Sequence, residues 1–97
     1  MQKRYDFGRN WSVFAAKIDD QKIQQAQDWL SRLFPDLQGA SFLDIGCGSG
    51  LHSLAALHLG ASHVTAIDID ADSVRTTREL LEKFAPNKNW TAEQADI

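Results

Sequence analysis

Apolar residues follow two alternating patterns along the chain. Short apolar runs alternate with longer segments in which apolar residues recur every three or four positions, so the runs predict β-strands and the longer segments predict helices. Because strand and helix alternate, the strands should be parallel and joined by right-handed crossovers, as in an α/β fold. The expected elements are strands at 42–45, 63–68 and 90–95 and helices at 19–34, 51–59 and 70–84.

Residues that favour helix ends support these boundaries. Asp19 or Asp20 is placed to cap the first helix, and Pro35 ends it. Asp70 is placed to cap the third helix, and Gly60 stands where a C-terminal glycine ends the second. We expect the first helix to pack on the sheet through a face made of Ile23, Ala26, Leu30, Leu33 and Phe34.

The third predicted helix also carries charged residues away from its apolar face. Glu79 and Lys83 stand at the i,i+4 spacing of a helical ion pair. We interpret the whole set as a solvated face, made of Arg75, Arg78, Glu79, Glu82 and Lys83.

The first predicted strand ends at three alternating glycines, Gly46, Gly48 and Gly50, and the next helix begins at once. This pattern is typical of a strand, a tight turn and a helix. A sharp turn that lets a ligand approach needs glycine, because a Cβ has no room there. The amides at the start of the helix should then face whatever occupies the turn. Cys47 lies inside this loop, and we interpret it as a small packed residue because no His or second Cys is spaced to make it a nucleophile.

Two acids stand at the carboxyl ends of the first two predicted strands, where open α/β sheets bind their ligands. Asp44 comes just before the first glycine, and its carboxylate would repel a pyrophosphate and attract a cation. Asp68 ends the second strand, and its distance from Gly50 is close to the ~20 residues typical of an acid that binds ribose hydroxyls. A nucleoside that also carries a positive charge satisfies both conditions.

These residues resemble the class I S-adenosylmethionine-dependent methyltransferases. The first motif of that family, an acid followed by Gly-x-Gly-x-Gly, is present from Asp44 to Gly50, and the acid that ends its second motif corresponds to Asp68. The third motif is often Gly-Asp-small residue, and Ala95-Asp96-Ile97 stands in its place with alanine for glycine. The resemblance covers residues 40–97 and extends to both ribosomal-protein and small-molecule methyltransferases. It implies a Rossmann-like three-layer α/β/α fold with parallel strands and S-adenosyl-L-methionine as the cofactor.

The resemblance also implies roles for individual residues. Asp44 would oppose the methionine ammonium of the donor, and the alternative is that it hydrogen-bonds amides of the glycine loop. Asp68 would bind the ribose, and Ile69 would lie on the adenine face or serve ordinary packing. Asp96 would accept from the adenine amino group, and the Ile97 amide would reach a ring nitrogen. The expected cofactor-binding residues are Asp44, Gly46, Cys47, Gly48, Gly50, Asp68, Ile69, Asp96 and Ile97. The catalytic residues stay unknown, because the acceptor-facing loops of this family follow later strands.

The chain has 97 residues, which is short for a nucleotide-binding α/β sheet, and it ends after the third predicted strand. We interpret it as a fragment that is inactive alone, with an aromatic N-terminal arm at 1–17 and the N-terminal half of a donor-binding domain at 18–97. The arm would cover the sheet or close over the ligand. In the family the strand order on this side is three, two, one, so the first strand would be an exposed apolar edge. We expect the fragment to self-associate through that edge.

Composition limits the partners. The chain is 43% apolar and 24% charged with a formal net charge of −3, which is typical of a globular protein. A mildly acidic balance gives no attraction to nucleic acid or to an anionic membrane. The methyl acceptor stays open among a small molecule, a protein and RNA, and we expect a small molecule rather than RNA. No window reaches the ~18 consecutive apolar residues of a membrane span. The single Cys47 fits a reducing cytoplasm, and the three histidines are not spaced to form a metal site.

Two other functions share parts of this pattern. The dinucleotide-binding fragment of an NAD-dependent oxidoreductase would also join a glycine loop to an acid. Its Gly-x-Gly-x-x-Gly pattern requires glycine at position 51 or 53, where Leu51 and Ser53 stand, and Asp44 is the wrong charge beside phosphates. A noncatalytic interaction module would be favoured if the protein ended at Ile97.

Overall fold

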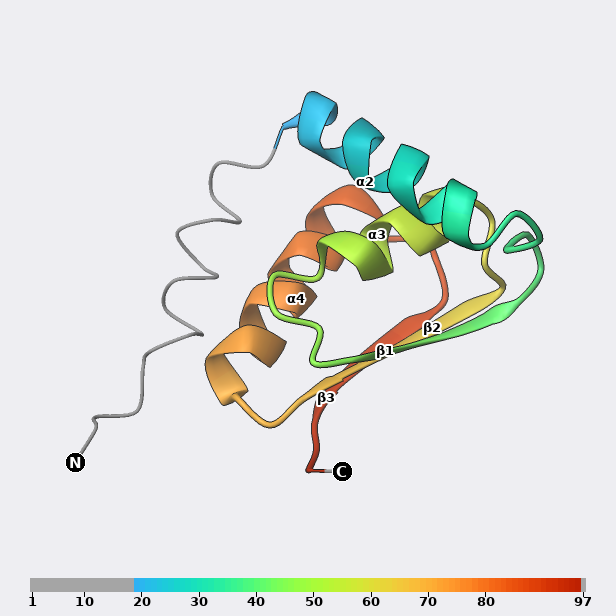
Figure 1. The fold of residues 1–97 in the computed structure, drawn as a ribbon. Helices are drawn as coiled ribbons and strands as arrows, with labels where there is room; N and C mark the ends of the chain where they lie inside the picture. The colour runs from blue at the N-terminus through green and yellow to red at the C-terminus, as the bar shows by residue number, and fades with distance from the viewer. Residues whose placement is uncertain (1–18, 97) are drawn as a thin grey trace.

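The fold was analysed in a computed structural model, which describes residues 19–96. The expected aromatic arm at 1–17 and Ile97, one of the residues expected to bind the cofactor, lie outside the described residues. The described elements follow the predicted order of three strands and three helices, and no boundary moves by more than one residue. They are α2 (Asp20–Leu33), β1 (Ser41–Ile45), α3 (Leu51–His58), β2 (His63–Asp68), α4 (Ala71–Phe84) and β3 (Trp90–Gln94) (Figure 1).

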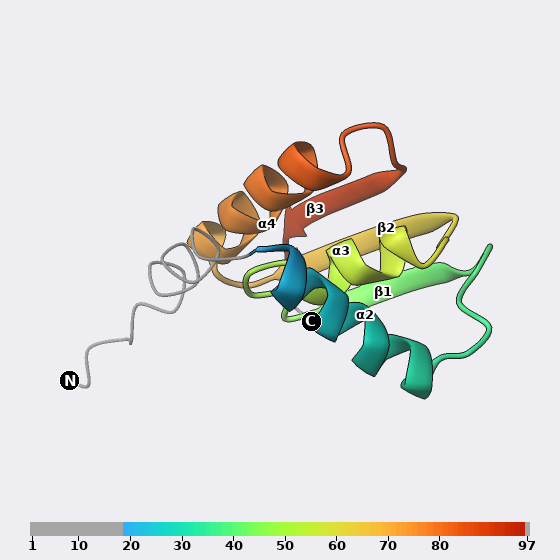
Figure 2. The ribbon, with the colours of Figure 1, turned by 90° about the horizontal axis from the view of Figure 1, so that it is seen from above.

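The three strands form one parallel sheet in the order β1-β2-β3, with β1 at an edge as expected. Asp44 of β1 is in register with Ala66 of β2, and Ala66 is in register with Ala92 of β3. The described helices cover one face of this sheet, with α4 on the β3 side and α3 between α4 and α2 (Figures 1 and 2). The prediction of a Rossmann-like α/β fold with parallel strands is confirmed, whereas within residues 19–96 no helix covers the second face that the expected three-layer arrangement would cover.

Helix α3 lies at the centre of the core. Leu54, Ala55 and Ala56 are fully buried, because the helix is enclosed by α2, α4 and the sheet. A helix that is apolar on all sides is typical of such a position. On α2 the buried residues Ile23, Ala26 and Leu30 are spaced as a single stripe, and the core therefore forms where this stripe meets α3.

The expectation that α2 packs on the sheet is wrong. The main contact of α2 with the rest of the fold is its packing against α3. The predicted burial of two residues of its apolar face is also wrong. Leu33 is 53% exposed and Phe34 is 47% exposed, and Phe34 is the C-cap residue rather than part of the helix. The Phe34 ring instead makes an edge contact with Phe42 of β1, with ring centroids 6.1 Å apart.

Caps fix the ends of the helices that flank the loops. Asp19 caps α2 by accepting a hydrogen bond from the Lys22 amide, and Asp70 caps α4 by accepting one from the Ser73 amide at 3.0 Å. Each carboxylate satisfies one of the amides that a helix leaves unpaired at its first turn. The cap at Asp70 fixes the start of α4 directly after the end of β2. Among the described residues, no helix has the length and apolar character to cross a membrane.

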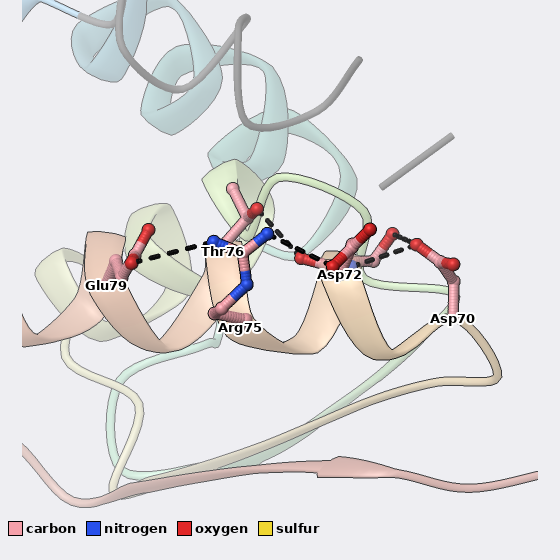
Figure 3. Close-up of polar contacts among 6 residues, drawn as sticks. Asp70, Asp72, Arg75, Thr76 and Glu79 are labelled. Carbon is pink, nitrogen blue, oxygen red and sulfur yellow. Dashed lines mark hydrogen bonds and ion pairs between the residues drawn. The ribbon is translucent and has the colours of Figure 1, made fainter. Parts of the chain in front are cut away.

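The charged residues of α4 pair differently from the prediction. Arg75 lies 3.1 Å from Asp72 and 3.9 Å from Glu79, so Arg75, not Lys83, is the cation that pairs with Glu79 (Figure 3). Lys83 instead lies over the ring of Phe84. Arg78 was expected to be solvated, but its Nε donates to the carbonyl oxygen of Ala92 on β3 at 2.9 Å.

Candidate ligand-binding site

The glycine loop between β1 and α3 bends through residues that require glycine. Gly46 and Gly50 adopt φ of 75° and 87°, in the left-handed region. A Cβ built on Gly50 would lie 2.9 Å from Cγ2 of Thr77, whereas a Cβ on Gly46 would meet nothing within 4 Å. The loop is therefore packed against α4 at Gly50 and open at Gly46.

Four amides of this loop bond within the protein. The amides of Gly46 and Cys47 both donate to the Ile67 carbonyl of β2, at 2.8 and 3.0 Å. The Gly50 amide donates to the Cys47 carbonyl at 2.9 Å, and the Gly48 amide donates to Oδ2 of Asp68 at 3.1 Å. The first amide of α3 lies 3.4 Å from Ser49 Oγ. These loop amides and the first amide of α3 therefore have acceptors within the protein, while the expectation that the next amides of the helix face a ligand stays a prediction.

Asp68 ends β2 and is held by backbone amides on both of its oxygens. Oδ2 accepts from Gly48, and Oδ1 accepts from the Asp70 amide at 2.9 Å. Each carboxylate oxygen can accept a second hydrogen bond, so the group is fixed in direction and can still bind a hydroxyl. The contact with a loop amide, which was the alternative for Asp44, belongs to Asp68.

Asp44 lies near the end of β1 on the helix side of the sheet and is held by a side chain. Its Oδ2 accepts from the hydroxyl of Ser53 at 2.7 Å. Ser53 is fully buried in the first turn of α3, so its hydroxyl has a defined direction. The sequence analysis gave Ser53 no role. A hydroxyl residue at a buried position of a helix rich in leucine and alanine was the signal that could have identified it.

A cavity of about 280 Å³ lies at the carboxyl ends of the strands. Among the residues expected to bind a cofactor, it brings together Gly46, Asp68, Ile69 and Asp96, and the sequence analysis missed three further lining residues. These are Ile45, Ile67 and Ala95. Two of the lining side chains, Ile45 and Ile69, are 60% and 55% exposed, so the cavity has apolar walls beside the Asp68 carboxylate.

The other predicted site residues that the structure describes do not line this cavity. Asp44, Gly48 and Gly50 lie on the helix side of the loop, as does Cys47, whose side chain is buried. A second, larger cavity of about 480 Å³ lies at the opposite end of β1, between 33 and 43. Neither of the strand-end acids Asp44 and Asp68 lines it, whereas Asp68 lines the smaller cavity, so the smaller cavity has the better chemistry for a nucleoside.

The thiol of Cys47 is not arranged as a nucleophile. Burial raises the pKa of this thiol, and the nearby carboxylates of Asp44 and Asp68 act in the same direction, while a hydrogen bond from Thr77 acts against them. A raised pKa keeps the thiol protonated at neutral pH. The interpretation of Cys47 as a small packed residue therefore agrees with its surroundings.

No group of three His, Cys, Asp or Glu side chains within residues 19–96 is arranged to hold a metal ion. His58 lies 3.1 Å from the Gln27 amide nitrogen and 3.2 Å from the Phe84 carbonyl. His52 stacks on Trp29 with ring centroids 5.0 Å apart. These two histidines thus connect helices rather than share a site.

The family model and the sequence relatives that match this chain carry the same description. Residues 13–95 match the family model described as ribosomal protein L11 methyltransferase (PrmA). The ribosomal protein L11 methyltransferase of Klebsiella pneumoniae is 40% identical over 78 residues, which cover 71% of this chain and 26% of the relative. That of Photobacterium profundum is 38% identical over 79 residues, which cover 72% of this chain and 26% of the relative. The chain thus spans about a quarter of the length of these relatives.

The fold also matches solved structures. A Pyrococcus horikoshii protein that has been proposed to be an RNA methyltransferase superposes with a TM-score of 0.57 at 22% identity, over 87% of this chain and 50% of that one. This likeness concerns the fold alone. The names of the sequence relatives give a ribosomal protein as methyl acceptor, and this finding overturns the expectation of a small-molecule acceptor. Net charge was a poor guide, since it bears on long-range attraction and not on which group reacts.

Proposed function

Since the chain belongs to the ribosomal protein L11 methyltransferase (PrmA) family, we propose that it binds S-adenosyl-L-methionine and forms the donor side of a site that methylates a protein. The acceptor we propose is a ribosomal protein, by analogy with the names of its relatives. Such an acceptor would be met in the cytoplasm.

The observation that carries this proposal is the fixed carboxylate of Asp68 at the wall of the strand-end cavity. Two backbone amides hold its oxygens at 3.1 and 2.9 Å, so the carboxylate does not have to be ordered when a ligand arrives. The remaining lone pairs can accept the two hydroxyls of a ribose. The apolar side chains of Ile45 and Ile69 beside it suit the flat face of an adenine ring.

The hydrogen bonds and charges around the glycine loop favour binding of a cationic nucleoside over binding of a dinucleotide. A pyrophosphate is bound by unpaired amides at the start of a helix, and the amides of Gly46, Cys47 and Gly48 already have acceptors within the protein. The carboxylates of Asp44 and Asp68 flank the same loop and would repel phosphate oxygens. The same charges favour the ammonium and sulfonium of S-adenosylmethionine. The oxidoreductase alternative is therefore the weaker one.

Each site residue then has a distinct task. Asp68 binds the ribose, Ile69 lies on the adenine, and Asp96 contacts the adenine edge. Asp44, oriented by Ser53, provides negative charge toward the methionine ammonium, directly or through water. Gly46 leaves open the space that a side chain would fill.

When bound, the donor supplies a methyl group on a positively charged sulfur, which leaves as a neutral thioether. The task of these residues is to hold that methyl in line with an acceptor nucleophile, and alignment of this kind contributes ~7–11 kcal/mol to lowering a barrier. No residue of the described part is assigned a proton transfer.

Calorimetry with the full-length protein tests the proposal. S-adenosylhomocysteine should release heat on binding, and NAD should not. Asp68→Ala should weaken the binding of S-adenosylhomocysteine by about 1–3 kcal/mol, because buried hydrogen-bond partners are left unpaired. Asp72→Ala is the matched control, since that carboxylate pairs with Arg75 on the surface of α4 and should leave affinity unchanged. Binding of NAD in place of S-adenosylhomocysteine would overturn the assignment.

A further inference from the structure

Thr77 is a polar residue at the centre of the buried face of α4. It is fully buried, and on the same face Val74 and Leu81 are also buried. An apolar side chain would suit a position in such a stripe. A hydroxyl at this place needs a partner, because an unpaired buried polar group is destabilising.

The partners of Thr77 lie in the glycine loop. Its Oγ1 donates toward Sγ of Cys47 at 3.2 Å and toward the Gly48 carbonyl oxygen at 3.1 Å. The Cα atom of Thr77 would lie 3.0 Å from a Cβ on Gly50. One side chain of α4 thus contacts three positions of the loop, two by hydrogen bonding and one by close packing.

These contacts extend to the carboxylate of Asp68. The carbonyl of Gly48 accepts from Thr77, and the amide of the same residue donates to Asp68 at 3.1 Å. Gly48 is therefore held at both of its backbone polar groups. We infer that Thr77 is a positioning residue for the donor: by fixing Gly48 it fixes the direction of the Asp68 carboxylate and so raises the affinity of the site. This inference rests on the proposed function.

Cys47 provides a reporter for the contact that does not depend on a ligand. It is the single cysteine of these 97 residues, and its signal is identified by its loss in Cys47→Ala. The hydrogen bond from Thr77 lowers the pKa of this thiol against the effect of burial. Loss of the hydroxyl should raise the pKa further, whereas a general loosening that admits water should lower it.

The test uses three variants of the full-length protein. Thr77→Val removes the hydroxyl and keeps the shape, and Thr77→Ser keeps the hydroxyl. Thr76→Val is the matched control, because Thr76 is a buried neighbour whose hydroxyl donates to the Asp72 carbonyl of its own helix at 2.8 Å. Affinity for S-adenosylhomocysteine is measured by calorimetry, stability by denaturation, and the Cys47 thiol by NMR titration of a ¹³C-labelled cysteine.

We expect Thr77→Val to bind about tenfold more weakly, as befits the loss of a buried hydrogen bond. Thr77→Ser should stay within about twofold of the unmodified protein, and Thr76→Val should bind as the unmodified protein does. The thiol pKa should rise in Thr77→Val alone.

Unchanged affinity in Thr77→Val, or an equal loss in Thr76→Val, would overturn the inference while leaving the proposed function intact. The absence of any binding by the unmodified protein would overturn both. In that case the thiol titration would still show whether Thr77 contacts the loop.

Discussion

Both the buried and the exposed face of α4 carry polar side chains that pair with other groups, but these contacts should contribute differently to stability. On the buried face, Thr77 contacts the glycine loop from a position with no exposure to water. On the exposed face, Arg75 pairs with Asp72 and Glu79, whose side chains are about half exposed or more (Figure 3). Water competes for the second set and not for the first, so a hydrogen bond counts for more when it is buried and holds a second segment of the chain.

The largest predicted effect comes from pushing the buried face away from the loop. Gly50→Ala would place a Cβ 2.9 Å from Cγ2 of Thr77 and impose a side chain on a φ of 87°. The left-handed backbone costs roughly 1–2 kcal/mol and overpacking about 1–3 kcal/mol. We expect a loss of about 2–5 kcal/mol in the free energy of unfolding, measured by chemical denaturation.

Gly39→Ala separates the two costs. Gly39 has a φ of 78° but nothing within 4 Å of a built Cβ, so that variant should lose only the roughly 1–2 kcal/mol of backbone strain. Equal losses in the two variants would show that the contact between Gly50 and Thr77 adds nothing, and the difference between the faces of α4 would then be smaller than the structure indicates.

The sequence predicted the elements of this region better than the contacts between them. The cap at Asp70, the loop glycines and the strand ends follow from local rules, because turns and caps depend on residues close in the chain. The contacts that hold the loop join residues far apart, as in Thr77 with Gly48 and Ser53 with Asp44. No periodicity shows which turn of one helix faces which residue of a loop.

Two contacts differ from what the spacing of residues along the chain suggests, and for the same reason. The spacing of Glu79 and Lys83 predicted a pair, but Arg75 takes Glu79 because its guanidinium also reaches Asp72. Loop contact was the alternative considered for Asp44, but the sheet register and the turn after β2 bring Asp68 to the Gly48 amide instead. Both outcomes depend on the three-dimensional positions of competing groups, which the spacing of residues along the chain does not contain.

A smaller effect on the free energy of unfolding is expected from the Cys47 thiol, which lies 3.2 Å from the Thr77 hydroxyl. Burial raises the pKa of the Cys47 thiol above its ordinary value of 9.0, so at alkaline pH the folded protein keeps a proton that the unfolded chain loses. The stabilising contribution is fully present below pH 9.0 and is lost as the pH rises through the folded pKa. Denaturation from pH 7 to 10.5 should show this loss, and Cys47→Ala should lack it.

The comparison between these two proteins removes the titration of other groups, since lysines and tyrosine contribute equally to both. The difference in their free energies of unfolding should be constant near neutral pH and should move in favour of Cys47→Ala above pH 9.0. A difference that stays constant over the whole range would mean that water reaches the thiol, and that this side of α4 is less closed than the hydrogen bonds indicate.

The smallest effect is expected on the exposed face. Its neighbours Asp72 and Glu79 raise the pKa of Arg75, first through the hydrogen bond with Asp72, but the Arg75 side chain is exposed on the surface of α4. Arg75→Ala therefore exchanges contacts with carboxylates for contacts with water, and exposed pairs of this kind often contribute nothing measurable. The free energy of unfolding and the affinity for S-adenosylhomocysteine should both stay at the values of the unmodified protein. A clear loss of affinity in Arg75→Ala would mean that this face also communicates with the site, because the Asp72 carbonyl lies in the turn that Asp70 caps.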